Sequence, residues 1–529
     1  MITRIPAHVW FVLLCLAWLL PGLVGHVPWR GADDITFAAF LQAREQATWL
    51  LPDASLSPLY LWIAQLFAQT FSVVLPLHDA VRLASGALAA SALWLTALAA
   101  QRLYGREAGW PAVFALMGCV GLLVPAHEIN PHIVQLAAMS LFLYGLVRML
   151  SDTLIGGGLA GLGLVALFLA GAWLPALGLA VALLLLPVVF PSWRTSARVG
   201  SSWFALLVAL TIAGMWLLSV QSRAPELLVA WWQTMRSDVV FLGGHGKPQY
   251  FVEALAWFGW PAWPVAGWAV YRLQREGWDS VKLWIPLGGL VVMFAALSLY
   301  ADPKQIQSLI LLPPLALLTG AGLAELRRGA ANALMWFAVM TFSVIALVFW
   351  AYWAAFDLDW PRHLAKRLAK LGMEGEGLRT TALLLGALIT LVWVIGLGWI
   401  RRQPRVPQRP ILVWSAGLTF IWCLLLALFM QPLDKRLGYA ELAAQIRQQV
   451  APQVCVQAKN TNATQRTLLA YHSGLKLHID EDSRCGWLLL GGKSQKEKAP
   501  GKGWQKQWEG GRPGDKGERF WLYRRTGDA

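Results

Sequence analysis

Long apolar segments recur along the chain and are separated by short polar stretches. A transmembrane helix needs about 20 mostly apolar residues, and thirteen segments come close to that length. They are residues 8–24, 80–101, 109–124, 133–150, 154–171, 174–191, 201–219, 254–272, 284–300, 306–323, 331–353, 380–400 and 411–430. The pattern therefore predicts an all-α polytopic membrane protein with about thirteen transmembrane helices.

Two further segments are amphipathic rather than uniformly apolar. Residues 57–76 include Gln65 and Gln69, and a span there would invert the side of every later loop. Residues 354–379 carry several basic side chains, among them Arg362, Lys366, Arg367 and Lys370. We predict that both segments lie along the outer face of the membrane as interfacial helices.

Lysine and arginine are distributed unevenly among the loops. Cytoplasmic loops are typically rich in both residues, and a cytoplasmic N-terminus places a basic residue in every inner loop. These residues are Arg102, Arg106, Arg148, Arg194, Arg198, Arg272, Arg275, Lys282, Arg327, Arg328, Arg401, Arg402, Arg405 and Arg409. Thirteen spans then place the C-terminus outside, so we predict a multi-pass protein of the bacterial inner (plasma) membrane with a periplasmic C-terminal domain.

The last hundred residues, 431–529, are polar where the preceding chain is apolar. An amphipathic run at 439–450 and three strand-like runs predict a small α/β periplasmic domain, interrupted by a Gly/Lys-rich loop near 491–517. The strand-like runs are residues 454–458, 487–490 and 520–524.

The predicted division is thus a membrane domain over residues 1–430 and a soluble domain over 431–529. The membrane domain includes two long periplasmic loops, residues 25–79 and 220–253.

Composition supports the membrane class. Hydrophobic residues make up 57% of the chain and charged residues 14%, whereas soluble domains carry about 25% charged residues. The net charge of +15 is therefore assigned to cytoplasmic loops and lipid headgroups, and we predict no nucleic-acid partner. In the polar tail, Cys455 and Cys485 are expected to pair if the tail is exported and to stay reduced if it is cytosolic.

Polar side chains gather in the predicted outer loops. Asp33 and Asp34 follow a span directly, where two adjacent carboxylates are costly unless they are solvated or used. The pair fits a solvated turn or helix N-cap. It fits equally well a general base that activates an acceptor hydroxyl or phosphate, and the sequence leaves both interpretations open.

A second cluster at residues 125–132 includes Glu128, Asn130 and His132. Capping the next helix needs only one of these side chains, so we interpret the cluster as the lining of a substrate cavity. Its spacing matches no recognised zinc site. In a third cluster, His245 lies in a glycine-rich stretch that suits either a loop moving over a substrate or an ordinary surface loop.

Two cations lie at the predicted outer ends of spans. Lys304 and Arg82 either extend to lipid headgroups or bind the phosphate of a lipid carrier. The sequence has no Walker loop, no GxSxG and no HExxH motif, which disfavours nucleotide hydrolysis and standard serine or zinc hydrolysis.

The order of these features resembles the type C glycosyltransferases that use polyprenyl-phosphate sugars, specifically the bacterial lipid A 4-amino-4-deoxy-L-arabinose transferases and their protein O-mannosyltransferase relatives. Weak motifs in a moderately specific order carry the resemblance over most of the chain. They are Trp29-Arg30-Gly31-Ala32-Asp33-Asp34, Ser57-Pro58-Leu59-Tyr60-Leu61-Trp62, Arg82, Asn130-Pro131, His245-Gly246-Lys247-Pro248, Pro261-Ala262-Trp263-Pro264, and Lys304 before Leu311-Leu312-Pro313-Pro314-Leu315.

The chain departs from the family pattern at four places. The family's Glu-Lys before the proline is Leu56-Ser57 here, its arginine after the acidic pair is Thr36, and its Asp before proline is Asn130. Gly171-Ala172-Trp173 replaces a Thr-Lys-Gly. Some charges that hold phosphate or position substrate in the family are therefore missing.

The resemblance implies an inverting transfer of a sugar from undecaprenyl phosphate to an acceptor, which is lipid A, another envelope glycan or a protein. It implies that Asp33 or Asp34 acts as the base, and that Lys304 and Arg82 hold the carrier phosphate. It implies no certain cofactor, and the use of a divalent metal differs among relatives. The residues expected to line the substrate cavity are Tyr60, Glu128, Asn130, His132 and His245.

Two other functions compete with a transferase. A transporter or flippase of lipid-linked sugars would show charges near the bilayer midplane and internal repeats, and neither is evident in the sequence. A non-catalytic paralogue would explain the missing charges. The sequence identifies neither the sugar, the acceptor nor the oligomeric state.

Overall fold

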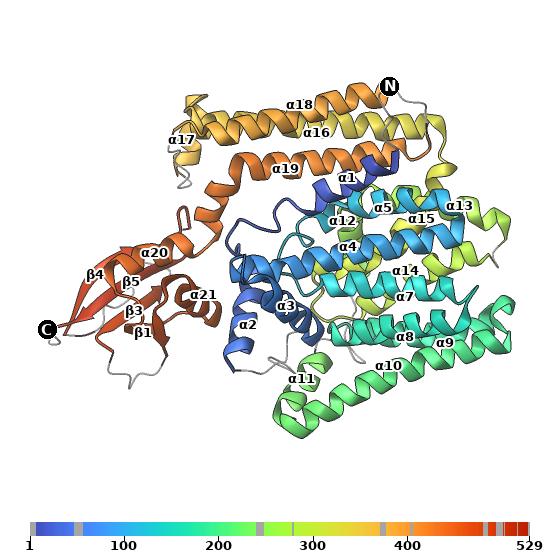
Figure 1. Ribbon diagram of the computed structural model, residues 1–529, viewed down its shortest axis with the longest axis horizontal. Coiled ribbons are helices and arrows are strands. Elements are labelled where there is room, and N and C mark those ends of the chain that lie inside the picture. Colours follow the sequence, from blue (N-terminus) through green and yellow to red (C-terminus); the bar gives the residue numbers. More distant parts are fainter. Residues whose placement is uncertain are drawn as a thin grey trace. The chain divides into compact units, whose positions relative to one another are not determined.

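The computed structural model describes residues 7–46, 57–237, 239, 248–277, 280–370, 377–402, 406–479, 485–492, 501, 503–515 and 517–526. Within these residues, long helices make up most of the chain and a small sheet lies near the C-terminus (Figure 1). The predicted fold class is thereby confirmed.

Each of the thirteen predicted spans forms one helix or two consecutive helices. Seven helical segments in the described residues are long and apolar enough to cross a membrane, and the chain is a multi-pass membrane protein. They are α4 (Leu77–Tyr104), α10 (Ser196–Arg223), α14 (Val281–Ser298), η4 with α15 (Gln305–Ala324), α16 (Arg328–Asp357), α18 (Thr380–Arg402) and α19 (Arg409–Leu437). The other predicted spans correspond to α1 (Ala7–Leu19), α5 (Gly109–Gly118) with α6 (Val120–Leu123), α7 (Ile133–Arg148), α8 (Thr153–Leu169), α9 (Trp173–Val189), and α12 (Pro248–Phe258) with α13 (Ala262–Leu273).

Two predicted spans are broken, which the apolar pattern does not reveal. One breaks at Cys119, whose backbone is extended between α5 and α6. The other breaks before Pro261, which has no N–H and disfavours a helical conformation in the residue before it. The Val120 N–H donates to the Trp260 carbonyl at 3.3 Å. One break thus provides a hydrogen-bond partner for the other, as a low-water environment requires.

Both predicted amphipathic segments are helical. In α3 (Pro58–Phe71), the Ser57 hydroxyl accepts a hydrogen bond from the Tyr60 N–H and a proline occupies the first turn, which together fix where the helix begins. In α17 (Arg362–Lys370), Leu368 is buried while the basic side chains are exposed. The sequence did not predict two other loop helices, α2 (Ala32–Gln46) and α11 (Pro225–Ser237).

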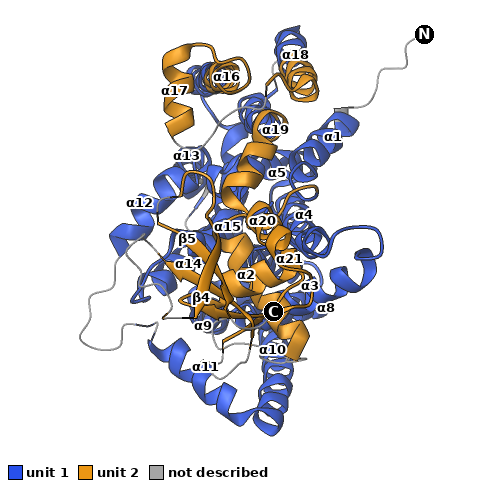
Figure 2. Cartoon of the chain, turned by 90° about the vertical axis from the view of Figure 1, so that its left-hand side faces the viewer, with its two compact units in different colours: residues 1–24, 48–344, 393–423 blue, residues 25–47, 345–392, 424–529 orange. Residues whose placement is uncertain are grey.

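The chain divides into two compact units (Figure 2). Unit 1 comprises residues 1–24, 48–344 and 393–423, and unit 2 comprises 25–47, 345–392 and 424–529. Residues 25–47, the first part of the loop after α1, thus belong to the same unit as the C-terminal residues, which the apolar pattern does not predict.

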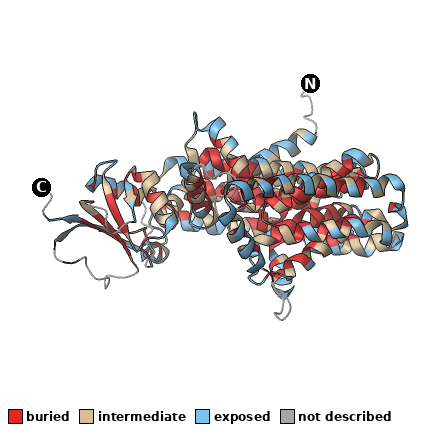
Figure 3. Ribbon diagram, turned by 90° about the horizontal axis from the view of Figure 1, so that it is seen from below, coloured by how far each residue is buried: buried red, intermediate tan, exposed pale blue. Residues whose placement is uncertain are grey.

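Buried residues of unit 1 lie where its helices face one another (Figure 3). Glycines permit a close approach between α7 and α8. A Cβ added at Gly145 would lie 2.4 Å from the backbone nitrogen of Ala160, and one at Gly163 would lie 2.7 Å from that of Phe142. Small residues at helix contacts are typical of membrane proteins, where close packing replaces the hydrophobic effect between helices.

The C-terminal residues of unit 2 form a five-stranded sheet with strand order β2-β1-β3-β5-β4. The strand β1 pairs in parallel with β2 and β3, while β5 is antiparallel to β3 and β4. The strands are β1 (Cys455–Lys459), β2 (Lys476–His478), β3 (Trp487–Gly492), β4 (Trp504–Gly510) and β5 (Arg519–Arg525), and the helices are α20 (Ala440–Gln449) and α21 (Ala463–Ser473).

The predicted strands and helix of the tail are confirmed, but the predicted loop near 491–517 contains β4 and the end of β3. The sequence of β4 is polar because it is an edge strand, and Gln505, Lys506 and Gln507 are exposed. An edge strand with charged and amide side chains lacks the apolar alternation that identifies a buried one.

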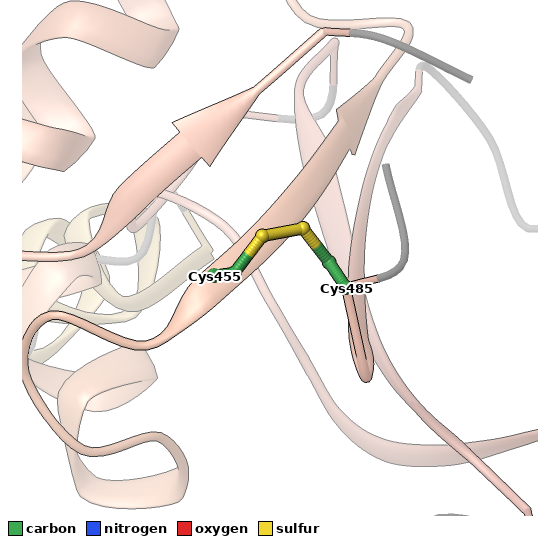
Figure 4. Close-up of a disulfide and its surroundings, with 2 residues drawn as sticks. All are labelled: Cys455 and Cys485. Atoms are coloured by element: carbon green, nitrogen blue, oxygen red, sulfur yellow. A yellow bond between two sulfur atoms is a disulfide. The ribbon is translucent and has the colours of Figure 1, made fainter. Parts of the chain in front are cut away.

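The two tail cysteines form a disulfide. Cys455 begins β1 and Cys485 precedes β3, with their Cα atoms 5.2 Å apart (Figure 4). Disulfides persist in oxidising compartments, so the bond agrees with the export predicted for the tail.

We expect protein purified without reductant to alkylate at Cys15, Cys119 and Cys423 only, after denaturation. Cys455 and Cys485 should react once a reductant is added. Replacing both cysteines by serine should lower the stability of the sheet by about 2–4 kcal/mol, because the disulfide restricts the unfolded chain. Mass spectrometry of alkylated peptides measures the pairing. Alkylation of Cys455 before reduction would contradict it.

Candidate functional site

The acidic pair of the first outer loop opens helix α2. The Trp29 N–H donates to Oδ2 of Asp33 at 2.9 Å, and the Gly31 N–H donates to Oδ1 of Asp34 at 2.9 Å. Gly31 has φ +134°, a conformation that favours glycine. Both carboxylates are buried and serve as local caps. Both side chains thus accept backbone hydrogen bonds from within the first turn of α2, which begins at Ala32, and their catalytic role stays a prediction.

Three contacts fasten this loop within unit 2. The Trp29 indole N–H donates to Asp434 at 2.7 Å, the Arg30 N–H donates to the Leu437 carbonyl at 3.1 Å, and Arg30 Nη1 lies 2.8 Å from Asp515. Leu437 ends α19, so its carbonyl has no partner inside the helix. The loop supplies that partner.

The pKa of Asp34 is raised above its usual value, chiefly because the carboxyl is buried. Hydrogen bonds from the Gly31 and Ile35 backbone oppose this shift, as does the positive charge of Arg512, while Asp33 adds to it. A carboxylate with a raised pKa accepts a proton more readily than an ordinary aspartate. Burial thus makes Asp34 a candidate base.

A second polar cluster lies in unit 1, where α3, α4 and the loop after α6 meet. The Tyr60 hydroxyl and the Ser85 hydroxyl lie 2.8 Å apart, and Ser85 also accepts from the Asn130 N–H at 3.3 Å. Tyr60 and Asn130 are fully buried. The amide nitrogen Nδ2 of Asn130 has no hydrogen-bond partner, which makes it a buried donor able to hold a ligand.

His132 follows on the same loop. Its N–H donates to Oδ1 of Asn130 at 3.0 Å, and its ring atom Nδ1 is buried without a partner. Burial lowers the pKa of His132 to about 4, with a smaller contribution in the same direction from Lys304 and an opposing one from its hydrogen bond with Gln135. The imidazole is therefore neutral near pH 7, and Lys304 is close enough to act on it.

Arg82 is fully buried in the first turns of α4. Its Nη1 atom donates to Asp79 Oδ1 at 2.8 Å, three residues earlier on the same helix. A buried guanidinium is tolerated only when it is paired, and Asp79 supplies that pairing.

The predicted site residues thus fall into two groups. Asp33 and Asp34 belong to unit 2, whereas Tyr60, Arg82, Glu128, Asn130, His132 and Lys304 belong to unit 1. Glu128 is half-buried and Lys304 is exposed. His245 lies outside the described residues.

Sequence reasoning missed several members of these clusters. Asp79 was recognisable from its spacing of three residues before Arg82, since such positions face one another on a helix. Ser85 and Gln135 resemble any other polar residue of a span. Nothing in the sequence pattern connects Arg512, Asp515 or Glu518 with the first loop, because the chain between them is about 480 residues long.

The described part of the chain contains no group of three or more His, Cys, Asp or Glu side chains that could hold a metal ion. Asn130 replaces a family carboxylate with a neutral amide, which is a poorer ligand for a hard cation. These donors do not fit a divalent metal.

A groove with a cavity volume of about 530 Å³ lies elsewhere in unit 1, beside α13 and α16. Its walls are almost entirely apolar and include Trp260, Trp268 and Phe337, with Arg327 as the charged member. None of the predicted site residues lines it. The groove suits a lipid chain and lacks the polar groups that sugar chemistry needs.

No protein-family model matches the chain, and no curated protein matches its sequence. The crystal structure of ArnT from Cupriavidus metallidurans bound to undecaprenyl phosphate is similar, with 16% identity and a TM-score of 0.67 over 92% of each chain. Its apo structure is similar at 15% identity, with a TM-score of 0.65 over 92% of this chain and 93% of that one. The resemblance to the type C glycosyltransferases is thus confirmed at the level of fold.

We expect His132 to make folding stability depend on pH. The pKa of His132 in the folded state is lowered to about 4, below the usual value of about 6.5. The unfolded chain therefore binds more protons between these values, and stability falls as pH drops below 6.5, by at most about 1.4 kcal/mol per unit. The apparent melting temperature of His132→Gln should fall less between pH 7.5 and 5 than that of the wild type. Equal falls would contradict the assignment.

Proposed function

We propose that the chain is an integral-membrane glycosyltransferase that moves a sugar from a polyprenyl-phosphate donor, such as undecaprenyl phosphate, to an acceptor of the cell envelope. The observation that carries this proposal is the fold shared over 92% of the chain with ArnT, a structure that holds undecaprenyl phosphate. The buried, capped carboxyl pair at the start of α2 supplies the candidate base.

The proposed reaction is a single displacement at the anomeric carbon of the donor sugar. An acceptor oxygen attacks that carbon from the face opposite the phosphate, the carbon–oxygen bond to the phosphate breaks, and the acceptor proton passes to Asp34. Undecaprenyl phosphate leaves as the anion, and the configuration at the anomeric carbon inverts. Asp33 holds the Trp29 backbone through its 2.9 Å hydrogen bond and so fixes the turn that presents Asp34.

Charge develops on the departing phosphate, so cations near it accelerate the reaction. We assign this role to Lys304, whose ammonium is exposed at the start of η4, and to Arg82, whose guanidinium is oriented by Asp79. His132 stays neutral beside Lys304 and therefore does not compete for the phosphate.

Sugar hydroxyls need both donors and acceptors in a water-poor site. The unpartnered Nδ2 of Asn130 and Nδ1 of His132 offer such groups, and we assign Tyr60 and Glu128 to the same cavity. His245 keeps this role as a sequence-based proposal.

We further propose a bacterial inner-membrane location with a cytoplasmic N-terminus. In this arrangement residues 1–430 form the membrane domain and residues 431–529 form a periplasmic domain. The Cys455–Cys485 disulfide supports an oxidising compartment for the latter. Membrane lipids and a lipid or glycan acceptor, with lipid A as one candidate, are the partners that follow.

We predict that Asp34→Asn lowers the rate of transfer about 10²–10⁴-fold, because an amide cannot accept the proton. Asp33→Asn should also lower the rate, because it weakens the hydrogen bond that fixes the turn before Asp34. The measurement is the glycosylated product that each gene copy restores in a deletion strain, at matched protein levels. The control is Asp302→Asn, an exposed carboxylate, which should behave as wild type. Full product from Asp34→Asn would refute the assigned base.

We predict that Lys304→Met weakens binding of undecaprenyl phosphate about tenfold, because the phosphate loses a charge-assisted contact. Native mass spectrometry of the detergent-purified protein measures the bound fraction as the lipid is titrated. Lys366→Met, on the exposed face of α17, is the matched control and should bind as wild type does. Equal affinity for both variants would remove Lys304 from the site.

A further inference from the structure

Arg512, in the turn before β5, shares two acceptors with the first outer loop. The Leu437 carbonyl accepts from the Arg30 N–H at 3.1 Å and from Arg512 Nη1 at 3.2 Å. The Asp515 carboxylate accepts from Arg30 Nη1 at 2.8 Å and from Arg512 Nη2 at 3.3 Å. All four residues belong to unit 2. The turn before β5 and the loop that carries Asp34 therefore donate to the same two acceptors.

The Arg512 side chain is buried, with 2% of its surface exposed. It forms an ion pair with Glu518, and its guanidinium carbon lies 4.5 Å from the centre of the Tyr439 ring. The Tyr439 hydroxyl in turn donates to Glu518 at 2.8 Å. A guanidinium held by a stacked ring and a carboxylate has a fixed orientation, so its charge acts from a fixed place.

The end of α19 brings these groups together. Its last carbonyl, on Leu437, lies at the negative end of the helix, where a cation is stabilised. The next residue is Gly438, where an added Cβ would lie 2.3 Å from a side-chain carbon of Val27. A larger residue at this position would clash with Val27, so glycine allows Val27 to lie against the end of α19, three residues before Arg30.

We propose that Arg512 is a positioning residue for Asp34: it holds the loop that carries Asp34 through Leu437 and Asp515, and it supplies the positive charge that the ionised carboxylate needs. This inference rests on the proposed function for its catalytic meaning, since Asp34 is the base assigned there. The proposed coupling between Arg512 and Asp34 does not depend on whether the chain transfers a sugar.

The charged groups acting on Asp34 support the coupling. Arg512 favours the ionised form, while Asp33 and burial oppose it, and Asp34 itself acts on the Tyr439 hydroxyl. Removing Arg512 leaves only the backbone hydrogen bonds from Gly31 and Ile35 against burial and Asp33. The pKa of Asp34 should then rise further, so that more of it is protonated near neutral pH.

A double-mutant thermal cycle tests the coupling without any substrate. The apparent melting temperatures of wild type, Arg512→Met, Asp34→Asn and the double variant are measured in detergent at pH 8 and pH 5. We expect Arg512→Met to cost less stability in the Asp34→Asn background at pH 8. This difference should be smaller at pH 5, because a carboxyl with a raised pKa gains protons as the pH falls. Other partners of Arg512, such as Glu518, cancel between the two backgrounds.

Two further variants distinguish positioning from a merely structural role. Arg512→Lys keeps the charge and should retain most of the coupling even where it loses stability. Arg519→Met, which removes an exposed arginine paired with Glu509, should show no coupling to Asp34 at either pH. Equal costs of Arg512→Met in both backgrounds at pH 8 would overturn the inference, even if the chain proves to be a transferase. A coupling that persists without detectable transfer would instead refute only the proposed function.

Discussion

The constraint that shapes this protein is the scarcity of water around its polar groups. Inside a bilayer each backbone or side-chain polar group needs a partner within the protein, and each buried charge needs an opposite charge. The structure meets this need at two places in the membrane helices. Arg82 pairs with Asp79, and the broken helices at Cys119 and Trp260 share a backbone hydrogen bond.

The exceptions to this rule are informative. Nδ2 of Asn130 and Nδ1 of His132 are buried without a partner, and an unpaired buried group costs about 1–3 kcal/mol. A bound ligand that forms the missing hydrogen bonds would offset this cost. In the family that the sequence resembles, a carboxylate stands at the position of Asn130, so the ligand that Asn130 meets is expected to offer an acceptor rather than a cation.

The membrane portion was largely predictable because a span is a property of about 20 consecutive residues. Breaks within spans were not, since Pro261 sits in an otherwise apolar run, and the polar edge strand β4 carries no apolar alternation. Asp33, Asp34 and Lys304 could be singled out because charges are rare beside spans. Arg512 could not, because its meaning depends on Leu437 and Asp515, which only folding brings to Arg30. Local chemistry is readable from sequence, whereas long-range pairing is not.

Transfer of a sugar from a polyprenyl-phosphate carrier is tested most directly by the envelope glycan profile of a strain that lacks the gene. Mass spectrometry of glycolipids, glycoproteins and lipid-linked sugars would be compared with the parent strain. If the chain is the transferase, one acceptor loses one fixed sugar mass, and the lipid-linked donor of that sugar is retained or accumulates. An unchanged profile, with lipid-linked sugars also unchanged under conditions where the protein is made, would contradict it.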